Sequence, residues 1–224
     1  MAKINKIDFE QVTEKHYDIS VTYSCNWQCN YCISDTHNQK PITHQQVLNQ
    51  IEDVPCDSTV SLSGGEPGMV EHDLLESYLI KLKEKNCVVT VNTNGTFLEK
   101  YPDLINKYID DVLYHCTSYV KDRKPIIEYN FDHIPKNLNF VYQLVITNDD
   151  TLEDIQYYLD KYPDIIFSIV GTNHCRVNGK YYKGLDRSKG FKIYQTFKDR
   201  LFLPHVPLLF LDSQKYENCI SAKL

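Results

Sequence analysis

The chain has 224 residues, a net charge of −6, 42% hydrophobic residues and 12% aromatic residues. This composition provides the core of one large or two small domains, and the 8 glycines and 9 prolines are too few for a disordered chain. The negative charge argues against a nucleic-acid polymer as partner, because such a partner requires a broad basic surface.

Predicted strands alternate with predicted helices along most of the chain. The strands are expected at 17–23, 59–63, 88–91, 111–116, 140–146 and 165–170, and the helices from Thr43 and over 71–86, 98–108 and 150–162. Strands separated by helices favour parallel pairing through right-handed crossovers. We therefore predict an α/β fold, a partial (β/α)6 barrel of parallel strands.

The strand and helix pattern also predicts how the chain is divided. The repeat ends at about Gly171, and Pro204 and Pro207 make a long helix in the apolar stretch 201–211 unfavourable. We expect an N-terminal segment over 1–16, a partial barrel over 17–170, and a C-terminal extension over 171–224 that packs on the barrel.

Neither an export signal nor a membrane-spanning segment is predicted. The first eleven residues, MAKINKIDFEQ, lack an apolar stretch, and no run approaches eighteen apolar residues. In such a chain, eight cysteines are expected to be reduced thiols and metal ligands rather than disulfides. The sequence therefore predicts a cytoplasmic protein.

Three of the cysteines, Cys25, Cys29 and Cys32, lie within eight residues in the run CNWQCNYC. The C-x3-C-x2-C spacing lets one loop turn three thiolates toward a common point. Structural zinc sites have four protein ligands and ferredoxin-type runs have four cysteines, so this set is one ligand short. We interpret it as an iron–sulfur site with one open iron, and a zinc or structural cluster site is the alternative.

Two further motifs follow the second and third predicted strands. The strand 59–63 runs into Gly64–Pro67 (GGEP), and the strand 88–91 runs into Asn92–Thr96 (NTNGT). The glycines permit close backbone approach to a ligand, Glu66 offers a carboxylate to an ammonium group, and the asparagine amides suit hydroxyl or carboxylate groups. Both motifs lie where βα barrels carry their chemistry, although each alone is also typical of a plain turn.

Together, the three motifs resemble those of the radical S-adenosylmethionine (SAM) superfamily over about residues 17–170. The resemblance implies that Cys25, Cys29 and Cys32 hold a [4Fe-4S] cluster whose open iron binds SAM, and that the GGEP motif holds the methionyl amino group. It also implies cofactor contacts from an aromatic residue near the adenine, from both turns and from the end of the fourth strand. These residues are Tyr31, Gly64, Gly65, Glu66, Pro67, Asn92, Asn94, His115 and Ser118.

The resemblance further implies reductive cleavage of SAM to a 5′-deoxyadenosyl radical that abstracts hydrogen from a substrate. An external electron donor of the flavodoxin or ferredoxin type is expected. We expect a small-molecule substrate, such as a nucleoside, nucleotide or modified base. The alternatives are a modifier of a peptide or protein and, in another class, a non-catalytic iron–sulfur or zinc module.

Each of the other candidate residues has a purely structural interpretation as well as a functional one. His115 is also typical of a partly buried structural histidine. Cys175 and Cys219 are candidates for a catalytic thiol, although packing in the core or at the surface is the default. Cys56, Cys87 and Cys116 lie in or beside apolar segments and are expected to pack as small hydrophobic side chains.

Overall fold

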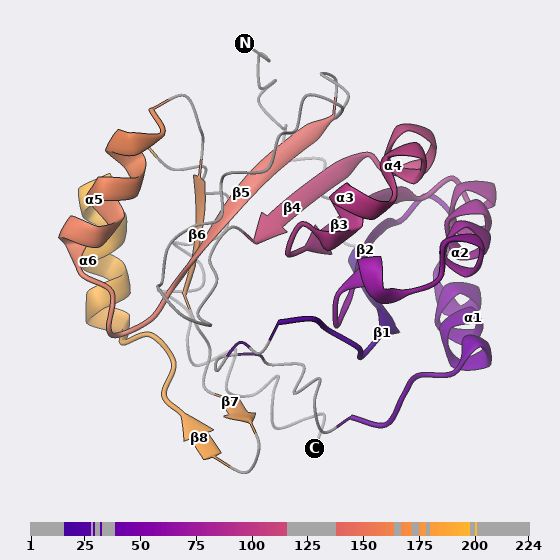
Figure 1. The fold of residues 1–224 in the computed structure, drawn as a ribbon, viewed down its shortest axis with the longest axis horizontal. Coiled ribbons are helices and arrows are strands. Elements are labelled where there is room, and N and C mark those ends of the chain that lie inside the picture. Colours follow the sequence, from indigo (N-terminus) through magenta and orange to yellow (C-terminus); the bar gives the residue numbers. More distant parts are fainter. Residues whose placement is uncertain are drawn as a thin grey trace.

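The computed structural model describes residues 16–27, 29, 32, 39–115, 138–163, 167–171, 175–177, 180–197 and 200. Its main sheet has six parallel strands in sequence order, with β1 and β6 at the edges (Figure 1). The strands are β1 (His16–Thr22), β2 (Thr59–Gly64), β3 (Val88–Thr93), β4 (Asp111–His115), β5 (Asn139–Ile146) and β6 (Phe167–Gly171). The predicted α/β fold with six parallel strands is confirmed.

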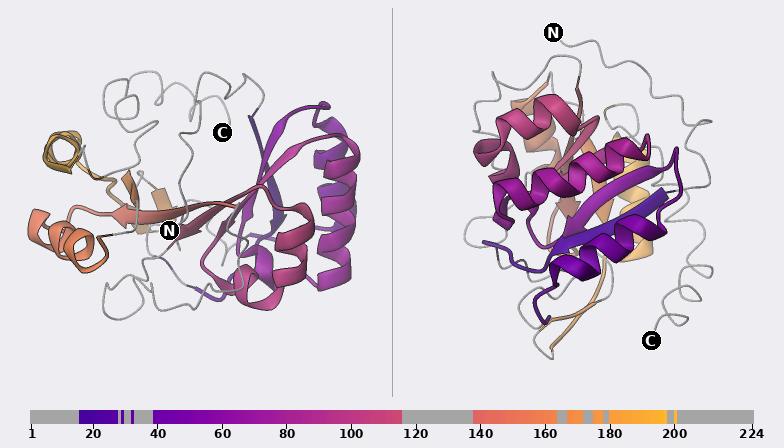
Figure 2. Two further views of the ribbon diagram at one scale, coloured as in Figure 1. Left: turned by 90° about the horizontal axis from the view of Figure 1, so that it is seen from above. Right: turned by 90° about the vertical axis from the view of Figure 1, so that its right-hand side faces the viewer.

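Helices lie beside both halves of this sheet. In Figures 1 and 2, α1, α2 and α4 lie beside the half formed by β1–β4, and α5 and α6 lie together at the other end. The helices are α1 (His44–Asp53), the 3-10 turn η2 (Pro67–Met69), α2 (His72–Glu84), α3 (Thr96–Lys100), α4 (Pro102–Tyr108), α5 (Leu152–Lys161) and α6 (Arg187–Phe197). None of the helices described is long and apolar enough to cross a membrane.

Capping residues explain where two of the predicted helices begin. Thr43 and Gln46 form a capping box at the start of α1, and Thr151 and Asp154 form another at the start of α5. In each box a side chain satisfies a backbone N–H that has no partner inside the helix. Both starts lie within two residues of their predicted positions.

The single helix predicted over 98–108 is instead two short helices, α3 and α4. Tyr101 separates them with φ −128° and ψ 53°, and Pro102 is the first residue of α4. Proline has no N–H to continue the preceding helix and disfavours helical backbone in the residue before it, but it suits a first helical position. The helix therefore restarts at Pro102.

The chain after β6 contains regular structure that the sequence did not predict. β7 (Cys175–Val177) and β8 (Lys180–Tyr182) form an antiparallel pair, and α6 follows them. Ile193 and Phe197 are buried in the same hydrophobic cluster as the barrel core. Their i, i+4 spacing was the available signal. The apolar stretch 201–211 lies outside the described residues, and the division at 1–16, 17–170 and 171–224 stays a prediction.

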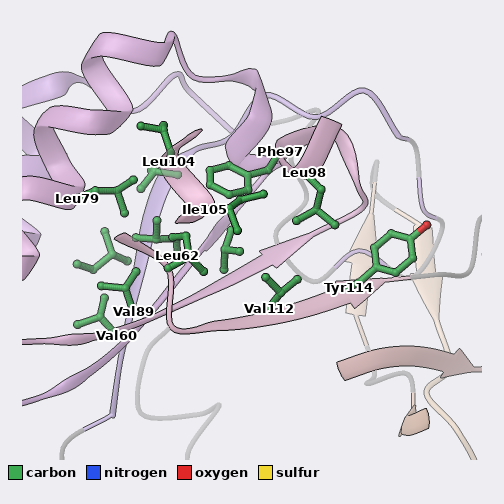
Figure 3. Close-up of a cluster of buried hydrophobic side chains, with 14 of the residues drawn as sticks. Val60, Leu62, Leu79, Val89, Phe97, Leu98, Leu104, Ile105, Val112 and Tyr114 are labelled. Carbon is green, nitrogen blue, oxygen red and sulfur yellow. The ribbon is translucent and has the colours of Figure 1, made fainter. Parts of the chain in front are cut away.

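The two faces of the sheet differ in polarity because side chains alternate along each strand. On the helix-covered face, Val60, Leu62, Val89 and Val112 are fully buried and pack with residues such as Leu79 (Figure 3). The opposite, inner face carries a polar set at matching registers. That set includes Ser61, Thr90, Asn92, Asp111 and His115. The fold thus turns its polar face toward the inside of the partial barrel.

One lysine joins the end of α1 to the end of α2, and its loss is expected to destabilise the fold. Lys85 Nζ donates to the carbonyl oxygens of Ile51 (2.7 Å), Glu52 (2.8 Å) and Val54 (2.6 Å) at the end of α1. A cation there satisfies carbonyls that lack helical partners and opposes the helix dipole. We expect Lys85→Met to lower the free energy of unfolding by about 1–3 kcal/mol in urea titrations. The control is Lys81→Met at an exposed position of α2; equal losses in both variants would contradict this role.

Candidate active site

The cysteine loop follows β1 directly. Cys25, Cys29 and Cys32 are half-buried, and none of the three is in a disulfide. The Cys32 N–H donates to the Cys29 carbonyl oxygen at 3.2 Å, so one turn joins the last two cysteines. The Trp27 N–H donates to Cys25 Sγ at 3.4 Å. The loop therefore presents three thiols from a short, hydrogen-bonded stretch.

The GGEP turn lies against the start of this loop through main-chain contacts. The Gly65 N–H donates to the Thr22 carbonyl oxygen at 2.6 Å, and the Glu66 N–H donates to the Ser24 carbonyl oxygen at 2.9 Å. Gly64 has φ +103°, which favours glycine. A Cβ atom on Gly65 would lie 2.1 Å from the Ser24 oxygen. The two glycines therefore permit the close backbone approach that sets the residue before Cys25.

We expect Gly65→Ala to disturb the cysteine loop, because its methyl group would overlap the Ser24 carbonyl group next to Cys25. Overpacking against backbone should lower the free energy of unfolding by about 1–3 kcal/mol. Iron and sulfide bound after anaerobic reconstitution should fall in parallel. Unchanged stability together with full iron content would show that the loop does not depend on this approach.

The carboxylate of Glu66 joins the GGEP turn to the turn after β3. Its Oε1 accepts from the Gly68 N–H (3.0 Å), the Thr93 hydroxyl (2.8 Å) and the Phe97 N–H (3.1 Å), and its Oε2 accepts from the Asn94 N–H (2.8 Å). Burial raises the pKa of Glu66, and the four donors oppose this shift.

The expectation that the Glu66 carboxylate receives an ammonium group stays a prediction. The side chain is 2% exposed, and protein groups already donate to both of its oxygens. The Gly68 N–H is local to the GGEP turn, but only the fold brings Thr93, Asn94 and Phe97 to this carboxylate, which is why the isolated motif did not indicate this role. In the structure, Glu66 is the polar link between two turns.

The asparagine turn completes the contact between the motifs. Asn94 is buried, and its Nδ2 donates to Asn26 Oδ1 at 2.9 Å and approaches Cys25 Sγ at 3.9 Å. Gly95 has φ +104°, which turns the chain from β3 into α3. Asn92 lies on the inner face of β3 and is half-buried. The three sequence motifs therefore form one site at the carboxyl ends of β1, β2 and β3.

The electrostatic surroundings of Cys25 favour binding of a positively charged metal centre by the cysteine sulfur. Burial raises the pKa of the Cys25 thiol, the Trp27 N–H opposes this shift, and the nearby Glu66 and Cys32 add to it. Bound metal stabilises thiolates in such surroundings, because its positive charge replaces the proton.

Comparison with known proteins identifies the family. A family model described as Radical SAM superfamily matches residues 19–171, which is more than half of the chain. The chain belongs to the radical SAM superfamily. Members of this superfamily are enzymes that use a [4Fe-4S] cluster and SAM. A comparison with curated protein sequences found no match.

Solved structures of radical SAM proteins share the fold. SuiB of Streptococcus suis bound to S-adenosylmethionine has a TM-score of 0.57 and 17% identity, covering 82% of this chain and 47% of its own. SuiB bound to the precursor peptide SuiA gives the same TM-score and identity, covering 82% and 45%. The protein anSMEcpe with bound AdoMet has a TM-score of 0.56 and 15% identity, covering 82% and 58%. The chain thus spans about half the length of these neighbours.

The thiols of the radical SAM motif fit the iron–sulfur cluster that members of the superfamily use, because cysteine binds iron as thiolate. Within the part of the chain that the structure describes, no group of three His, Cys, Asp or Glu side chains could hold one metal ion. The three cysteines lie on one short loop, and the ligands of a multi-iron cluster bind separate irons, so the loop fits such a cluster.

His115 ends β4 on the inner face of the radical SAM barrel, in register with Gln143 of β5. It is half-buried, and burial lowers its pKa to about 4. Desolvation disfavours the charged imidazolium, so the side chain is neutral at pH 7. A neutral imidazole here can donate or accept a hydrogen bond without adding charge.

Because the folded-state pKa of His115 lies below its ordinary value of 6.5, folding stability should depend on this residue in acid. Between pH 6.5 and about 4, the unfolded state binds a proton that the folded state does not, so the free energy of unfolding falls as pH falls. We expect a loss of about 1–3 kcal/mol over this window that His115→Gln largely removes. Urea titrations at several pH values measure it; identical pH profiles for both proteins would contradict it.

The remaining predicted site residues have different outcomes. Tyr31, Ser118 and Cys219 lie outside the described residues, and Cys175 is the first residue of β7, with no description of its side chain. Cys87 is buried as predicted, whereas the prediction for Cys56 is wrong. Cys56 is exposed because it lies in the turn between α1 and β2.

Sequence reasoning missed three side chains of the site, Asn26, Thr93 and Thr96. Thr93 binds Glu66, and the other two contact Asn94. Both threonines lie within two residues of Asn94 in the sequence, which was the available signal. For Asn26, the sequence offered no signal beyond its position next to Cys25.

Proposed function

We propose that this chain cleaves SAM reductively and directs the resulting radical to a substrate bound on the inner face of the partial barrel. The observation that carries this proposal is that hydrogen bonds connect the three motifs into one site. Glu66 and Asn94 link the GGEP turn and the asparagine turn, and Asn94 reaches the sulfur of Cys25. A [4Fe-4S] cluster bound there would supply the electron that cleaves SAM to methionine and a 5′-deoxyadenosyl radical.

In this proposal, the residues of the chain hold and orient both cofactors. Cys25, Cys29 and Cys32 hold the cluster as thiolates. The backbone at Gly64 and Gly65 permits close approach of the methionyl end of SAM, and Glu66 acts as a positioning residue, since its carboxylate is bound within the protein. Asn92 and neutral His115 offer uncharged hydrogen-bonding groups on the inner face.

The remaining proposed cofactor contacts come from the resemblance to the family. Tyr31 would lie near the adenine, and Pro67 and Ser118 would complete the SAM site. An external one-electron donor of the flavodoxin or ferredoxin type would supply the electron, because the cleavage is reductive. We further propose that the enzyme acts in the cytoplasm, where thiols stay reduced.

The proposal is tested by anaerobic reconstitution of the full chain with iron and sulfide. We expect a brown protein whose reduced electron paramagnetic resonance (EPR) spectrum changes when SAM is added. Dithionite should then yield 5′-deoxyadenosine and methionine in equal amounts. A colourless zinc protein, or a cluster protein that neither responds to SAM nor forms 5′-deoxyadenosine, would instead support a non-catalytic module.

Two substrate classes are candidates for the radical. A small molecule, such as a nucleoside, nucleotide or modified base, suits the polar inner face of the sheet. A peptide or protein is the second candidate, since structures of two fold neighbours, SuiB and anSMEcpe, contain a bound peptide. We expect the correct class to increase 5′-deoxyadenosine formation and to transfer deuterium from labelled substrate into that product. Labelled nucleotides and labelled peptides, assayed side by side, distinguish the two.

A further inference from the structure

Three polar side chains close a ring of hydrogen bonds between the cysteine loop and the asparagine turn. Asn26 Nδ2 donates to Thr96 Oγ1 at 2.9 Å, and Thr96 Oγ1 donates to Asn94 Oδ1 at 2.8 Å. Asn94 Nδ2 then donates to Asn26 Oδ1 at 2.9 Å. Each side chain is both donor and acceptor, and such connected bonds polarise and strengthen one another. The ring joins residues about seventy positions apart in the chain.

A backbone donor sets the direction of every bond in this ring. The Thr96 N–H donates to Asn94 Oδ1 at 3.2 Å, so that oxygen must face Thr96 and the Asn94 amide nitrogen must face Asn26. Asn26 therefore presents its oxygen to Asn94 and its amide nitrogen to Thr96. The orientation of both amides follows from one fixed N–H, which makes the ring a single connected unit.

The same amide that closes the ring also reaches the first cysteine. Asn94 Nδ2 has two hydrogens; one is donated to Asn26, and Cys25 Sγ lies 3.9 Å from the same nitrogen. Cys25 Sγ also accepts from the Trp27 N–H at 3.4 Å. Hydrogen bonds to cysteine sulfur help to set the reduction potential of iron–sulfur clusters. Asn26 and the Thr96 N–H therefore hold the two ends of the Asn94 amide group whose nitrogen faces the Cys25 sulfur.

We propose that Asn26 is a positioning residue for Cys25, acting through Asn94 and Thr96. It holds the start of the cysteine loop against the asparagine turn and aims the Asn94 amide at the cysteine sulfur. The proposal rests on the proposed function, in which Cys25 is a cluster ligand, and it adds a role for a residue inside the cysteine motif itself.

The test compares reconstituted wild-type protein with Asn26→Ala, Thr96→Val, the double variant and Thr96→Ser. Loss of one hydrogen bond should make cluster release to an iron chelator roughly three- to tenfold faster in Asn26→Ala and in Thr96→Val. The double variant should release no faster than either single one, because both changes open the same ring. Thr96→Ser keeps the hydroxyl and should behave as wild type.

A second readout separates positioning of the cysteine from simple loop stability. The reduction potential of the Asn26→Ala cluster should become more negative, because the N–H directed at Cys25 sulfur is less well held. The matched control is Asn49→Ala, an exposed asparagine on α1 that accepts a hydrogen bond from Gln45. This control should keep the wild-type release rate and potential.

The outcomes distinguish this proposal from the proposed function. Wild-type release rate and potential in Asn26→Ala would overturn the positioning role while the function stands. Additive effects of the two single variants, or a Thr96→Ser variant as impaired as Thr96→Val, would also overturn it. A wild-type protein that forms no SAM-responsive cluster would instead overturn the proposed function.

Discussion

Replacing any one of Cys25, Cys29 and Cys32 with alanine is expected to abolish cluster retention and SAM cleavage. All three cysteines are half-buried on one loop and in no disulfide, and they are the protein ligands that we propose for the cluster. Loss of outer-shell partners of metal sites already costs 10- to 100-fold, so loss of a ligand should reduce 5′-deoxyadenosine formation by at least about a hundredfold. Iron and sulfide content and the EPR spectrum should show the same loss.

Two other cysteines provide matched controls. Cys56 is exposed and Cys87 is buried, so Cys56→Ala and Cys87→Ala test the effect of removing a thiol outside the motif. Both controls should retain the cluster, although Cys87→Ala should lose some stability. A variant lacking all three motif cysteines that still binds iron and sulfide and cleaves SAM would be incompatible with the proposed function.

Glu66→Ala is expected to cause the second large effect, on both stability and cofactor binding. The substitution leaves four donors without their acceptor, in surroundings where Glu66 is 2% exposed. Removing one partner of a buried charged network costs about 3–5 kcal/mol. We expect a fall of this size in the free energy of unfolding, measured in urea, together with loss of SAM binding.

Glu66→Gln separates the two effects, because it keeps the shape of the side chain but places an amide N–H toward backbone donors. It should recover part of the stability and less of the SAM binding. Glu99→Ala, at an exposed position of α3, is the matched control and should change neither. If Glu66→Ala bound SAM normally, the carboxylate would not position the site.

The fold was predictable because its signals are local and periodic. Alternating apolar residues marked β2, and the starts of α1 and α5 were predicted to within two residues. The break at Pro102 was visible in the sequence but was not used. β7, β8 and α6 were not predicted, because short strands and a helix with a narrow apolar stripe give weak periodicity.

The candidate site was predictable only as separate motifs. The cysteines, the GGEP turn and the asparagine turn were each evident, but their mutual contacts join residues that are far apart in the chain. The contacts of Glu66 were not evident for this reason, since three of its four donors come from positions 93–97. Asn26 was not identified, because the role of an asparagine cannot be predicted until its hydrogen-bond partners are known.

The amino-acid sequence alone determined the family, the three thiols and the six parallel strands, because these depend on residue type, spacing and local periodicity. The tertiary structure decided which groups share hydrogen bonds, which side chains are buried and which way each amide faces. Parallel pairing brings the ends of β1, β2 and β3 to the same edge of the sheet. At that edge, Asn94 meets both Cys25 and Glu66, a contact that no local pattern encodes.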